Sequence, residues 1–294
     1  MTDSINKRAQ YKSRGQLGAI WYRFKKNKLA MAGLAVFLFL VLVAVFADVI
    51  ADYETEVVKQ NMQIRFTPPC AEHWFGTDDY GRDIFARIVH GTRISLFVGI
   101  ISILVSLAIG SVIGAAAGYY GGRTDDIIMR FMDVFLAIPS TLLAISVVAA
   151  LGQGMTNLVI AMSSSQIPRF ARIVRSSILS IKGQEFIEAA RCCGMRDSRI
   201  ILRHILPNAI GPIIVQCTLN IARMILTISG LSFVGLGISP PTPEWGSMLA
   251  SARSSMRYYP YLVLFPGIAI AITVMSLNLI GDGLRDALDP KMKN

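Results

Sequence analysis

The chain has 294 residues, of which 53% are hydrophobic and only 16% are charged, and its mean hydropathy is +0.51. These values exclude an ordinary soluble domain, in which about a quarter of the residues are charged. The net charge of +10 would suit a nucleic-acid-binding protein, but the basic residues gather beside apolar runs, which is typical of a membrane protein.

Membrane spans are predicted from four windows that contain no Asp, Glu, Lys or Arg. Each is long enough to cross the ~30 Å hydrocarbon core as a helix. The windows cover residues 29–47, 94–122, 134–168 and 258–281. The first follows a basic segment but lacks a signal-peptide cleavage site, so we interpret it as an uncleaved span.

The third window is too long for one helix, because it would extend about 52 Å at 1.5 Å per residue. The sequence GQGMTN at 152–157 predicts a tight turn in its middle. With one further apolar run, the sequence predicts an all-α integral membrane protein with six transmembrane helices. The predicted spans are residues 29–50, 94–118, 130–150, 155–171, 208–232 and 259–281.

The distribution of Lys and Arg supports six spans with both termini in the cytoplasm. In this topology the inner segments hold 21 basic residues and the outer segments hold 7, as expected for residues that stay on the cytoplasmic side. We expect residues 1–28 and 282–294 to be cytoplasmic, and residues 29–281 to form one membrane domain. An outer loop at 51–93 and a cytoplasmic loop at 172–207 would belong to that domain.

A helix, a turn and a second helix are predicted within the cytoplasmic loop. The stretch QEFIEAARCCG favours a helix that ends at Gly194, where a positive φ is required. Asp197 or Ser198 can cap the second helix, and Pro207 suits the first turn of the next span. The apolar spacing favours a docking element over a solvated surface loop, but by itself it leaves both open.

This segment also carries a residue pattern, namely Glu188, Ala189, Ala190, Gly194, His204 and Pro207. The pattern resembles the EAA loop of the inner-membrane permease subunits of ATP-binding cassette (ABC) importers. In that family the loop forms a coupling helix that seats in a cleft of the ATPase subunit. The resemblance implies that Glu188 anchors this contact, that Gly194 forms the turn, and that Ala189 and Ala190 form the close-packing surface.

Three further motifs extend the resemblance over nearly all of the chain. They are FGTDDYGRDIFARIVHGTRISL (75–96), LSFVGLGISPPTPEWGSML (231–249) and NLIGDGLRDALDP (278–290). They are similar to the dipeptide, oligopeptide and glutathione (peptide/nickel) branch, specifically its C-type permease. One departure is IPRFAR at 167–172, where many relatives have a Trp before the YAR box.

The resemblance implies a type I ABC importer permease fold and a set of partners. These are a second, homologous permease chain that completes a heterodimer, two ATP-binding subunits, an extracytoplasmic substrate-binding protein and a peptide substrate. ATP and Mg would be used by the ATP-binding subunits, and the chain would lie in the bacterial cytoplasmic (inner) membrane.

No catalytic, cofactor or metal chemistry is predicted for the chain itself. It contains no G-x-x-x-x-G-K-[ST], H-E-x-x-H or G-x-S-x-G motif, and its three histidines (His73, His90 and His204) are isolated. The four cysteines show neither metal-ligand spacing nor a disulfide framework. The chain is therefore predicted not to be an enzyme and to bind no nucleic acid, metal or cofactor.

A polar stripe is predicted on the span at 208–232. It consists of Gln216, Asn220, Arg223 and Thr227, which helical spacing puts on one face. Arg223 lies about 22 Å along this helix and could bind a peptide carboxylate in the translocation path. Alternatively, the stripe packs helices together, with Arg223 paired to a neighbouring subunit or extended to the membrane surface.

An outer motif, GTDDYGRD at 76–83, contains the turn-forming residues expected of a folded cap. Its candidate residues are Gly76, Thr77, Asp78, Gly81, Arg82 and Asp83. We expect the cap to help receive the substrate-binding protein, and an equally plausible interpretation is a self-contained turn held by local hydrogen bonds.

Two regular patterns have structural interpretations. The glycines at 110, 114 and 118 allow another helix to approach closely, and we favour packing within the chain over a subunit contact. The arginines at 169, 172 and 175 continue the fourth span into the cytoplasm, where they anchor the topology.

Taken together, these features predict the permease subunit of an ATP-driven importer for short peptides. Glutathione and a nickel chelate are alternative substrates within the same family. An ATP-independent secondary transporter is the alternative from another class, but it would need coupling-ion residues in its spans, which this sequence scarcely offers.

Overall fold

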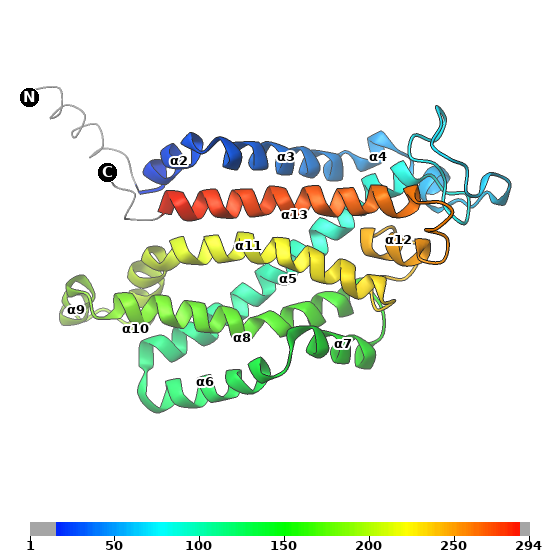
Figure 1. Cartoon of the computed structure of the whole chain (residues 1–294). Helices are drawn as coiled ribbons and strands as arrows, with labels where there is room; N and C mark the ends of the chain where they lie inside the picture. The colour runs from blue at the N-terminus through cyan, green and yellow to red at the C-terminus, as the bar shows by residue number, and fades with distance from the viewer. Residues whose placement is uncertain (1–15, 289–294) are drawn as a thin grey trace, which may run out of the picture.

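A computed structural model describes residues 16–288, which form a bundle of helices running side by side between two ends (Figure 1). One end carries α9 (Glu185–Cys192) and both ends of the described chain. The other carries α12 (Trp245–Ala252) and the long loop after α4 (Ala47–Ile50). We call these the α9 end and the α12 end.

The remaining helices complete the bundle in chain order. The first part contains α2 (Gln16–Lys26), α3 (Lys28–Val45), η1 (Tyr53–Val58), η2 (Met62–Ile64), α5 (Ile84–Tyr120), α6 (Gly122–Ala137) and α7 (Ser140–Leu151). The second part contains α8 (Met155–Lys182), α10 (Asp197–Ile200), η3 (Ile201–Ile205), α11 (Leu206–Phe233) and α13 (Tyr261–Leu288).

Four helices of the described chain are long and apolar enough to cross a membrane. They are Lys28–Val45, Ile84–Tyr120, Asp197–Phe233 and Tyr261–Leu288. The bent pair α6 and α7 is a fifth candidate if it counts as one span. The chain is therefore an all-helical membrane protein with four or five candidate spans by this measure.

The span predicted at 130–150 is not one helix. The chain breaks at Ile138 and Pro139, and α6 and α7 meet at 84°. Ile138 is extended (φ −88°, ψ 127°), as expected for a residue that precedes proline, whose ring disfavours the helical conformation there. The turn predicted at GQGMTN is confirmed, with positive φ at Gly152 and Gly154 between α7 and α8.

The span predicted at 94–118 begins ten residues earlier than expected, at Ile84. Asp83 caps this helix by accepting a hydrogen bond from the backbone of Ala86 at 2.9 Å. Charged residues in the early turns find partners in the chain. For example, Arg93 donates to Asp48 at 2.9 Å and to the carbonyl of Ala44 at 2.9 Å. Such pairing explains why the helix extends into a charged stretch of sequence.

The glycine stripe on α5 packs against α8 within the same chain. A Cβ atom added at Gly110 would lie 2.7 Å from Cβ of Phe170, and one at Gly114 would lie 2.3 Å from the carbonyl oxygen of Ala171. The prediction of internal packing is therefore confirmed, because only glycine leaves room for the α8 backbone.

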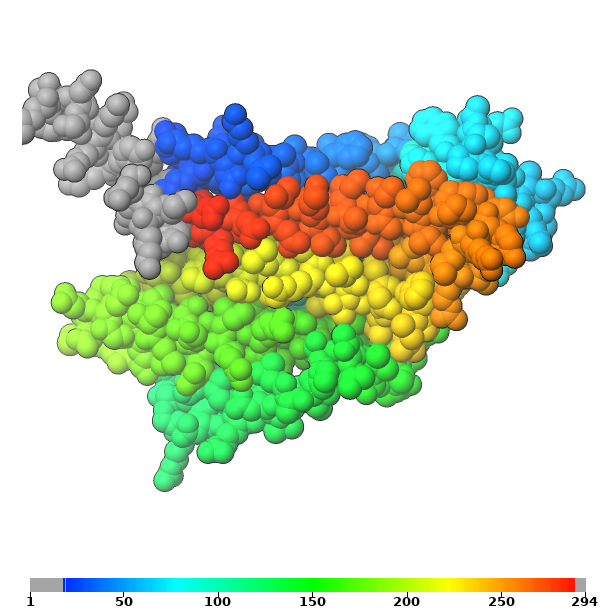
Figure 2. Space-filling view, in the orientation of Figure 1, coloured from blue at the N-terminus to red at the C-terminus, as the bar shows by residue number. Residues whose placement is uncertain are grey.

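The predicted boundary at residue 281 does not end the last helix, which continues to Leu288 beside α3 (Figure 2). Gly283 lies against α3, where an added Cβ would come 2.2 Å from Cβ of Ala30. Packing of this kind stabilises the helix even where Asp282 and Arg285 restore charge to the sequence. Residues 289–294, with the final Asp-Pro of the last motif, lie outside the described residues, as do residues 1–15.

Candidate functional site

The EAA segment, defined here as residues 185–205, projects from the α9 end of the bundle (Figure 1). Its first helix, α9, ends as predicted at Gly194, which has φ +72°. The amide of Gly194 donates to the carbonyl of Arg191 at 2.9 Å, and the amide of Met195 donates to that of Ala190 at 3.2 Å. These two bonds satisfy carbonyls at the helix end, where they would otherwise lack partners.

The prediction that Asp197 or Ser198 caps α10 is wrong. Arg196 occupies the cap position, and no side chain makes a capping hydrogen bond there. The carboxylate of Asp197 instead accepts a hydrogen bond from the hydroxyl of Tyr119 at 2.6 Å. Local sequence does not reveal this tertiary contact, and Asp197 lies in the first turn of α10 rather than at its cap position.

The second part of the EAA segment continues into α11 without a break. At η3 the helix has a wider, π-helical turn. The amide of Leu206 donates to the carbonyl of Ile201, five residues back. Pro207, in the first turn of α11 as predicted, has no amide proton to offer to the carbonyl four residues before it. The side chain of Asn208 donates to the next carbonyl along, that of His204, at 2.6 Å. The η3 turn therefore accommodates the proline.

Apolar residues attach the EAA segment to the bundle. Ile187, Ile200 and Ile205 are fully buried in a cluster with residues of α5, α8 and α11. Of the two alanines predicted to pack closely, Ala190 is buried in the same cluster, but Ala189 is exposed. The predicted packing surface is thus divided, because adjacent residues of a helix point in different directions.

The opposite face of the segment is open and mixed in character. Phe186 is 40% exposed and Leu202 is 66% exposed. Glu188, Arg196 and Arg199 are also exposed, and none of them forms an ion pair within residues 16–288. Rigid attachment on one face and unpaired charge with exposed apolar groups on the other are features of a docking surface.

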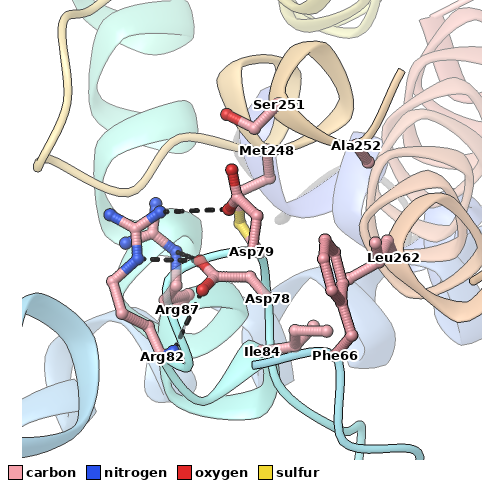
Figure 3. Close-up of a pocket in the computed structure, with 10 residues that line it drawn as sticks. All are labelled: Phe66, Asp78, Asp79, Arg82, Ile84, Arg87, Met248, Ser251, Ala252 and Leu262. Atoms are coloured by element: carbon pink, nitrogen blue, oxygen red, sulfur yellow. Dashed lines mark hydrogen bonds and ion pairs between the residues drawn. The ribbon is translucent and has the colours of Figure 1, made fainter. Parts of the chain in front are cut away.

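At the α12 end, Asp78 is the centre of the GTDDYGRD motif (Figure 3). Its Oδ1 accepts hydrogen bonds from the amides of Tyr80 and Arg82 at 2.9 and 3.0 Å. Its Oδ2 accepts from Nε of Arg82 at 2.7 Å and lies 3.6 Å from Nε of Arg87. The side chain of Arg82 is only 4% exposed, so this is a buried network in which charge is matched.

Arg87 connects this network to distant parts of the chain. It donates to the carbonyls of Val57 at 3.0 Å and Pro241 at 3.4 Å. A cavity of about 20 Å³ beside Asp79 and Arg82 has room for about one water molecule, which excludes a peptide. Arg87 was not predicted as part of the motif, because both of its hydrogen bonds go to backbone carbonyls distant in sequence, which a side-chain pattern does not reveal.

Two glycines allow the motif to fold tightly. Gly76 has φ +80° and Gly81 has φ +71°. A Cβ atom at Gly81 would lie 1.8 Å from the carbonyl oxygen of Asn61, and one at Gly76 would lie 2.6 Å from that of Thr67. Hydrogen bonds within the motif and backbone hydrogen bonds to Asn61 and Thr67 together hold this fold, so local hydrogen bonds account for only part of it.

The two ends of the motif are joined to each other and to α5. Thr77 and Asp83 form an isolated antiparallel bridge, and Oδ2 of Asp83 also accepts a 2.7 Å hydrogen bond from Nδ1 of His73. Because Asp83 caps α5 as well, this one carboxylate joins the loop, the motif and the helix.

Asp79 differs electrostatically from its neighbour Asp78. Burial raises the pKa of Asp79 above its usual range, and the nearby negative charge of Asp78 raises it further. Arg82 offsets these effects only in part, since its closest nitrogen is 3.8 Å from the Asp79 carboxylate.

The polar stripe predicted on α11 is divided between interior and surface. Asn220 is buried, and its Nδ2 has no hydrogen-bond partner within the described chain. Arg223 is exposed, whereas Gln216 and Thr227 are half-buried. Thr227 donates to the carbonyl of Arg223 at 2.9 Å, in the same helix. The structure therefore brings three of the four residues to the accessible face and leaves Asn220 inside.

A groove of about 1450 Å³ continues this face toward the α9 end. Gln216 and Asn208 line it from α11, and apolar residues form most of the remaining wall. All its ionisable lining residues are arginines, namely Arg169, Arg172 and Arg285. The sequence predicted Arg169 and Arg172 as topological anchors. Their three-residue spacing on a helix was the signal that they share a face.

Two family models match this chain. The model described as "Binding-protein-dependent transport system inner membrane component" matches residues 110–294. The chain belongs to this family. The model described as "N-terminal TM domain of oligopeptide transport permease C" matches residues 15–69, which confirms the predicted C type.

The permease is similar to transport proteins for two kinds of substrate. It is 48% identical over 272 residues to the dipeptide transport system permease protein DppC of Alkalihalophilus pseudofirmus, a match that covers 92% of this chain and 89% of the relative. It is 47% identical over 274 residues to the glutathione transport system permease protein GsiD of Pectobacterium atrosepticum, covering 93% and 91%.

The fold of the permease is similar to that of a solved ABC importer. The inward-facing methionine transporter MetNI gives a TM-score of 0.57 at 18% identity, covering 69% of this chain and 97% of that chain. The permease is thus a multi-pass membrane protein of a bacterial ABC importer that includes ATPase subunits. It is a transport subunit rather than an enzyme, and its family binds no cofactor itself.

Proposed function

We propose that this permease forms one half of the translocation pathway of an ATP-driven importer for short peptides. Its 48% identity to a dipeptide permease over 92% of the chain carries the proposal. Glutathione, itself a tripeptide derivative, is the second candidate because identity to a glutathione permease is nearly equal. A nickel chelate is the third, and it rests on the family resemblance alone.

In this proposal the chain crosses the membrane six times. The α6–α7 pair would be one crossing and α8 another, in addition to the four long apolar helices. The α9 end would be cytoplasmic, because this topology leaves 21 of the basic residues on the inner side and 7 on the outer side. Residues 1–28 and 282–294 would then be cytoplasmic, and residues 51–93 would contain the outer loop.

The EAA segment would dock on an ATPase subunit. Its buried face joins it firmly to α5, α8 and α11, so that a displacement at the docking contact would move these helices. Its open face offers Glu188 as an anchoring charge beside the exposed side chains of Phe186 and Leu202. ATP binding would close the two ATPases, move the segment and alternate the access of the pathway. A second, homologous permease would supply the other half.

The substrate pathway would follow the accessible face of α11 and the groove beside it. Arg223, with Gln216 and Thr227, would form a polar wall, and Arg223 would bind the carboxylate of the peptide. Arginines lining the groove would continue this positive potential toward the cytoplasm. We expect Arg223→Gln to lower uptake at limiting peptide, with Arg123→Gln, an exposed arginine of α6 outside the groove and both docking surfaces, as the matched control.

The substrate-binding protein would dock at the α12 end. The GTDDYGRD motif would serve as the rigid base of this surface rather than as the contact itself, because its charges already pair with one another. Exposed aromatic side chains near it, including Trp74 (65% exposed) and Tyr258 (76% exposed), are the better candidates for direct contact.

The test is ATP-dependent uptake of labelled dipeptide and of labelled glutathione into proteoliposomes. These would contain the permease with its partner permease, ATPases and binding protein. We expect uptake of at least one substrate, and we expect Glu188→Lys and Gly194→Asp to weaken both uptake and ATPase association. Asp126→Lys, which reverses an exposed charge on α6 outside both proposed docking surfaces, is the matched control. Uptake by this chain without ATP would establish a secondary transporter instead.

A further inference from the structure

Tyr119 lies near the end of α5 and touches several elements of the α9 end at once. Its side chain is nearly buried, at 4% exposure, within the apolar cluster that attaches the EAA segment. Its hydroxyl donates a 2.6 Å hydrogen bond to Oδ1 of Asp197 in α10. The carboxylate is a charged acceptor, so this is one of the stronger kinds of hydrogen bond.

Two cations lie over the ring of the same tyrosine. The guanidinium carbon of Arg191, in α9, is 5.2 Å from the ring centre, and Nζ of Lys182, at the end of α8, is 5.8 Å away. Both distances are within the range of a cation–π interaction. One side chain of α5 therefore contacts α8, α9 and α10, and both halves of the EAA segment meet it.

The helix that carries Tyr119, α5, extends from one end of the bundle to the other. It runs for 37 residues from Ile84 to Tyr120, about 55 Å at 1.5 Å per residue. At its other end Asp83 both caps it and bonds the His73 ring. Its glycine stripe lies directly against the backbone of α8. The EAA segment and the GTDDYGRD motif thus lie at opposite ends of one continuous helix.

We propose that Tyr119 is a positioning residue that latches the EAA segment to α5, so that movement of the segment at the ATPase contact is passed to the α12 end. This inference rests on the proposed docking of the EAA segment. Apolar packing attaches the segment but is non-directional, whereas the Tyr119–Asp197 bond also fixes the distance and direction between α10 and α5.

The test compares peptide uptake with ATP hydrolysis in proteoliposomes that contain the complete importer. We expect Tyr119→Phe to lower the peptide taken up per ATP hydrolysed by roughly fivefold or more, with ATPase association unchanged. Asp197→Ala should have a similar effect, and Asp197→Asn, which keeps an acceptor oxygen, should restore most of the ratio. Tyr120→Phe is the matched control, because the hydroxyl of Tyr120 is exposed and makes no hydrogen bond to the described residues.

A double variant separates a latch from a general loss of stability. If the two residues act through their mutual bond, Tyr119→Phe with Asp197→Ala should be no worse than either change alone. An unchanged uptake ratio in Tyr119→Phe, or additive effects of the two changes, would overturn the proposal.

Failure of the latch can be told apart from failure of the docking assignment. If Glu188→Lys leaves ATPase association intact, the EAA segment is not the docking element and the proposed function loses its coupling step. If Glu188→Lys abolishes association while Tyr119→Phe keeps the wild-type ratio, only the latch is wrong.

Discussion

The GTDDYGRD motif and the EAA segment contain similar types of residue, but these residues have different surroundings in the two regions. Each has a glycine with positive φ, +71° at Gly81 and +72° at Gly194. A Cβ atom at Gly81 would lie 1.8 Å from a carbonyl oxygen, whereas one at Gly194 would meet nothing within 4 Å. Asp78 and Arg82 form a buried pair, whereas Glu188 is exposed and forms no ion pair with any residue in 16–288.

The difference separates residues that hold the fold from residues available to a partner. Charges that satisfy one another in the interior stabilise a shape and have little left to offer to another protein. Charges left unpaired on a rigidly attached surface can bind one. Substitutions at matched positions in the two regions should therefore affect different quantities: stability at the α12 end, and association at the α9 end.

The largest expected effect comes from adding one methyl group to each glycine. Gly81→Ala should destabilise the folded permease by more than about 4 kcal/mol, because the Cβ would overlap the backbone of Asn61. Gly194→Ala should cost only about 1–2 kcal/mol, the strain of a left-handed residue in open space. Thermal unfolding in detergent and the yield of folded protein measure both. Equal losses would contradict the comparison.

Removing a central charge should have the next largest effect. Asp78→Asn leaves Arg82 and Arg87 buried without their carboxylate, so we expect a loss of about 3 kcal/mol in the free energy of unfolding. Asp133→Asn is the control, because the ion pair of Asp133 with Arg172 is more than half exposed and should contribute less than about 1 kcal/mol. If Asp133→Asn lowered the free energy of unfolding as much as Asp78→Asn, burial of the ion pair would not be the cause of the loss.

Truncation of an exposed apolar residue tests the expectation that substitutions at the α9 end affect association rather than stability. Leu202→Ala should change the free energy of unfolding by less than about 0.5 kcal/mol, because Leu202 is 66% exposed. The same change should weaken association with the ATPase by about 1–2 kcal/mol. Ile205→Ala, at a fully buried position nearby, should instead cost about 2–4 kcal/mol of stability. Unfolding and co-purification measurements on both variants distinguish the two faces of the segment.

The smallest effect concerns the pH dependence of the α12 end. Burial raises the pKa of Asp79 in the folded state, so the folded protein holds this proton more tightly than the unfolded chain. Ionisation of Asp79 therefore lowers stability as the pH rises from the unfolded pKa through the raised one. We expect Asp79→Asn to be slightly more stable than wild type near neutral pH, and the advantage to shrink as the pH falls. Melting temperatures of both proteins between about pH 7 and pH 4 test this sign.

Much of the fold follows from local patterns in the sequence. The span predicted at 208–232 agrees closely with α11 (Leu206–Phe233), because Pro207 marks its start and the mainly apolar stretch that follows contains a single charged residue, Arg223. The turn at GQGMTN and the end of α9 at Gly194 were predictable for the same reason, since positive φ favours glycine. The break at Pro139 was missed, because a proline inside an apolar run is also compatible with a kinked membrane helix.

The candidate site was predictable in outline but not in its contacts. Motif spacing identified the EAA segment and the GTDDYGRD motif, and the family models bear out the family to which those motifs pointed. The roles of individual residues depended on what lies opposite them. Asp197 was expected to cap a helix and instead accepts from Tyr119, which is 78 residues earlier in the chain. Asn220, which helical spacing put on one face with Gln216 and Arg223, lies buried.

By itself, the sequence determined that this protein is helical and membrane-embedded, that it belongs to a permease family, and where its principal turns lie. These properties depend on composition, periodicity and residues with special backbone freedom, all of which are local. The tertiary structure alone decided which charges are satisfied within the chain and which remain open to a partner. That distinction depends on burial and on groups distant in sequence, such as the carbonyls of Asn61, Val57 and Pro241 at the α12 end.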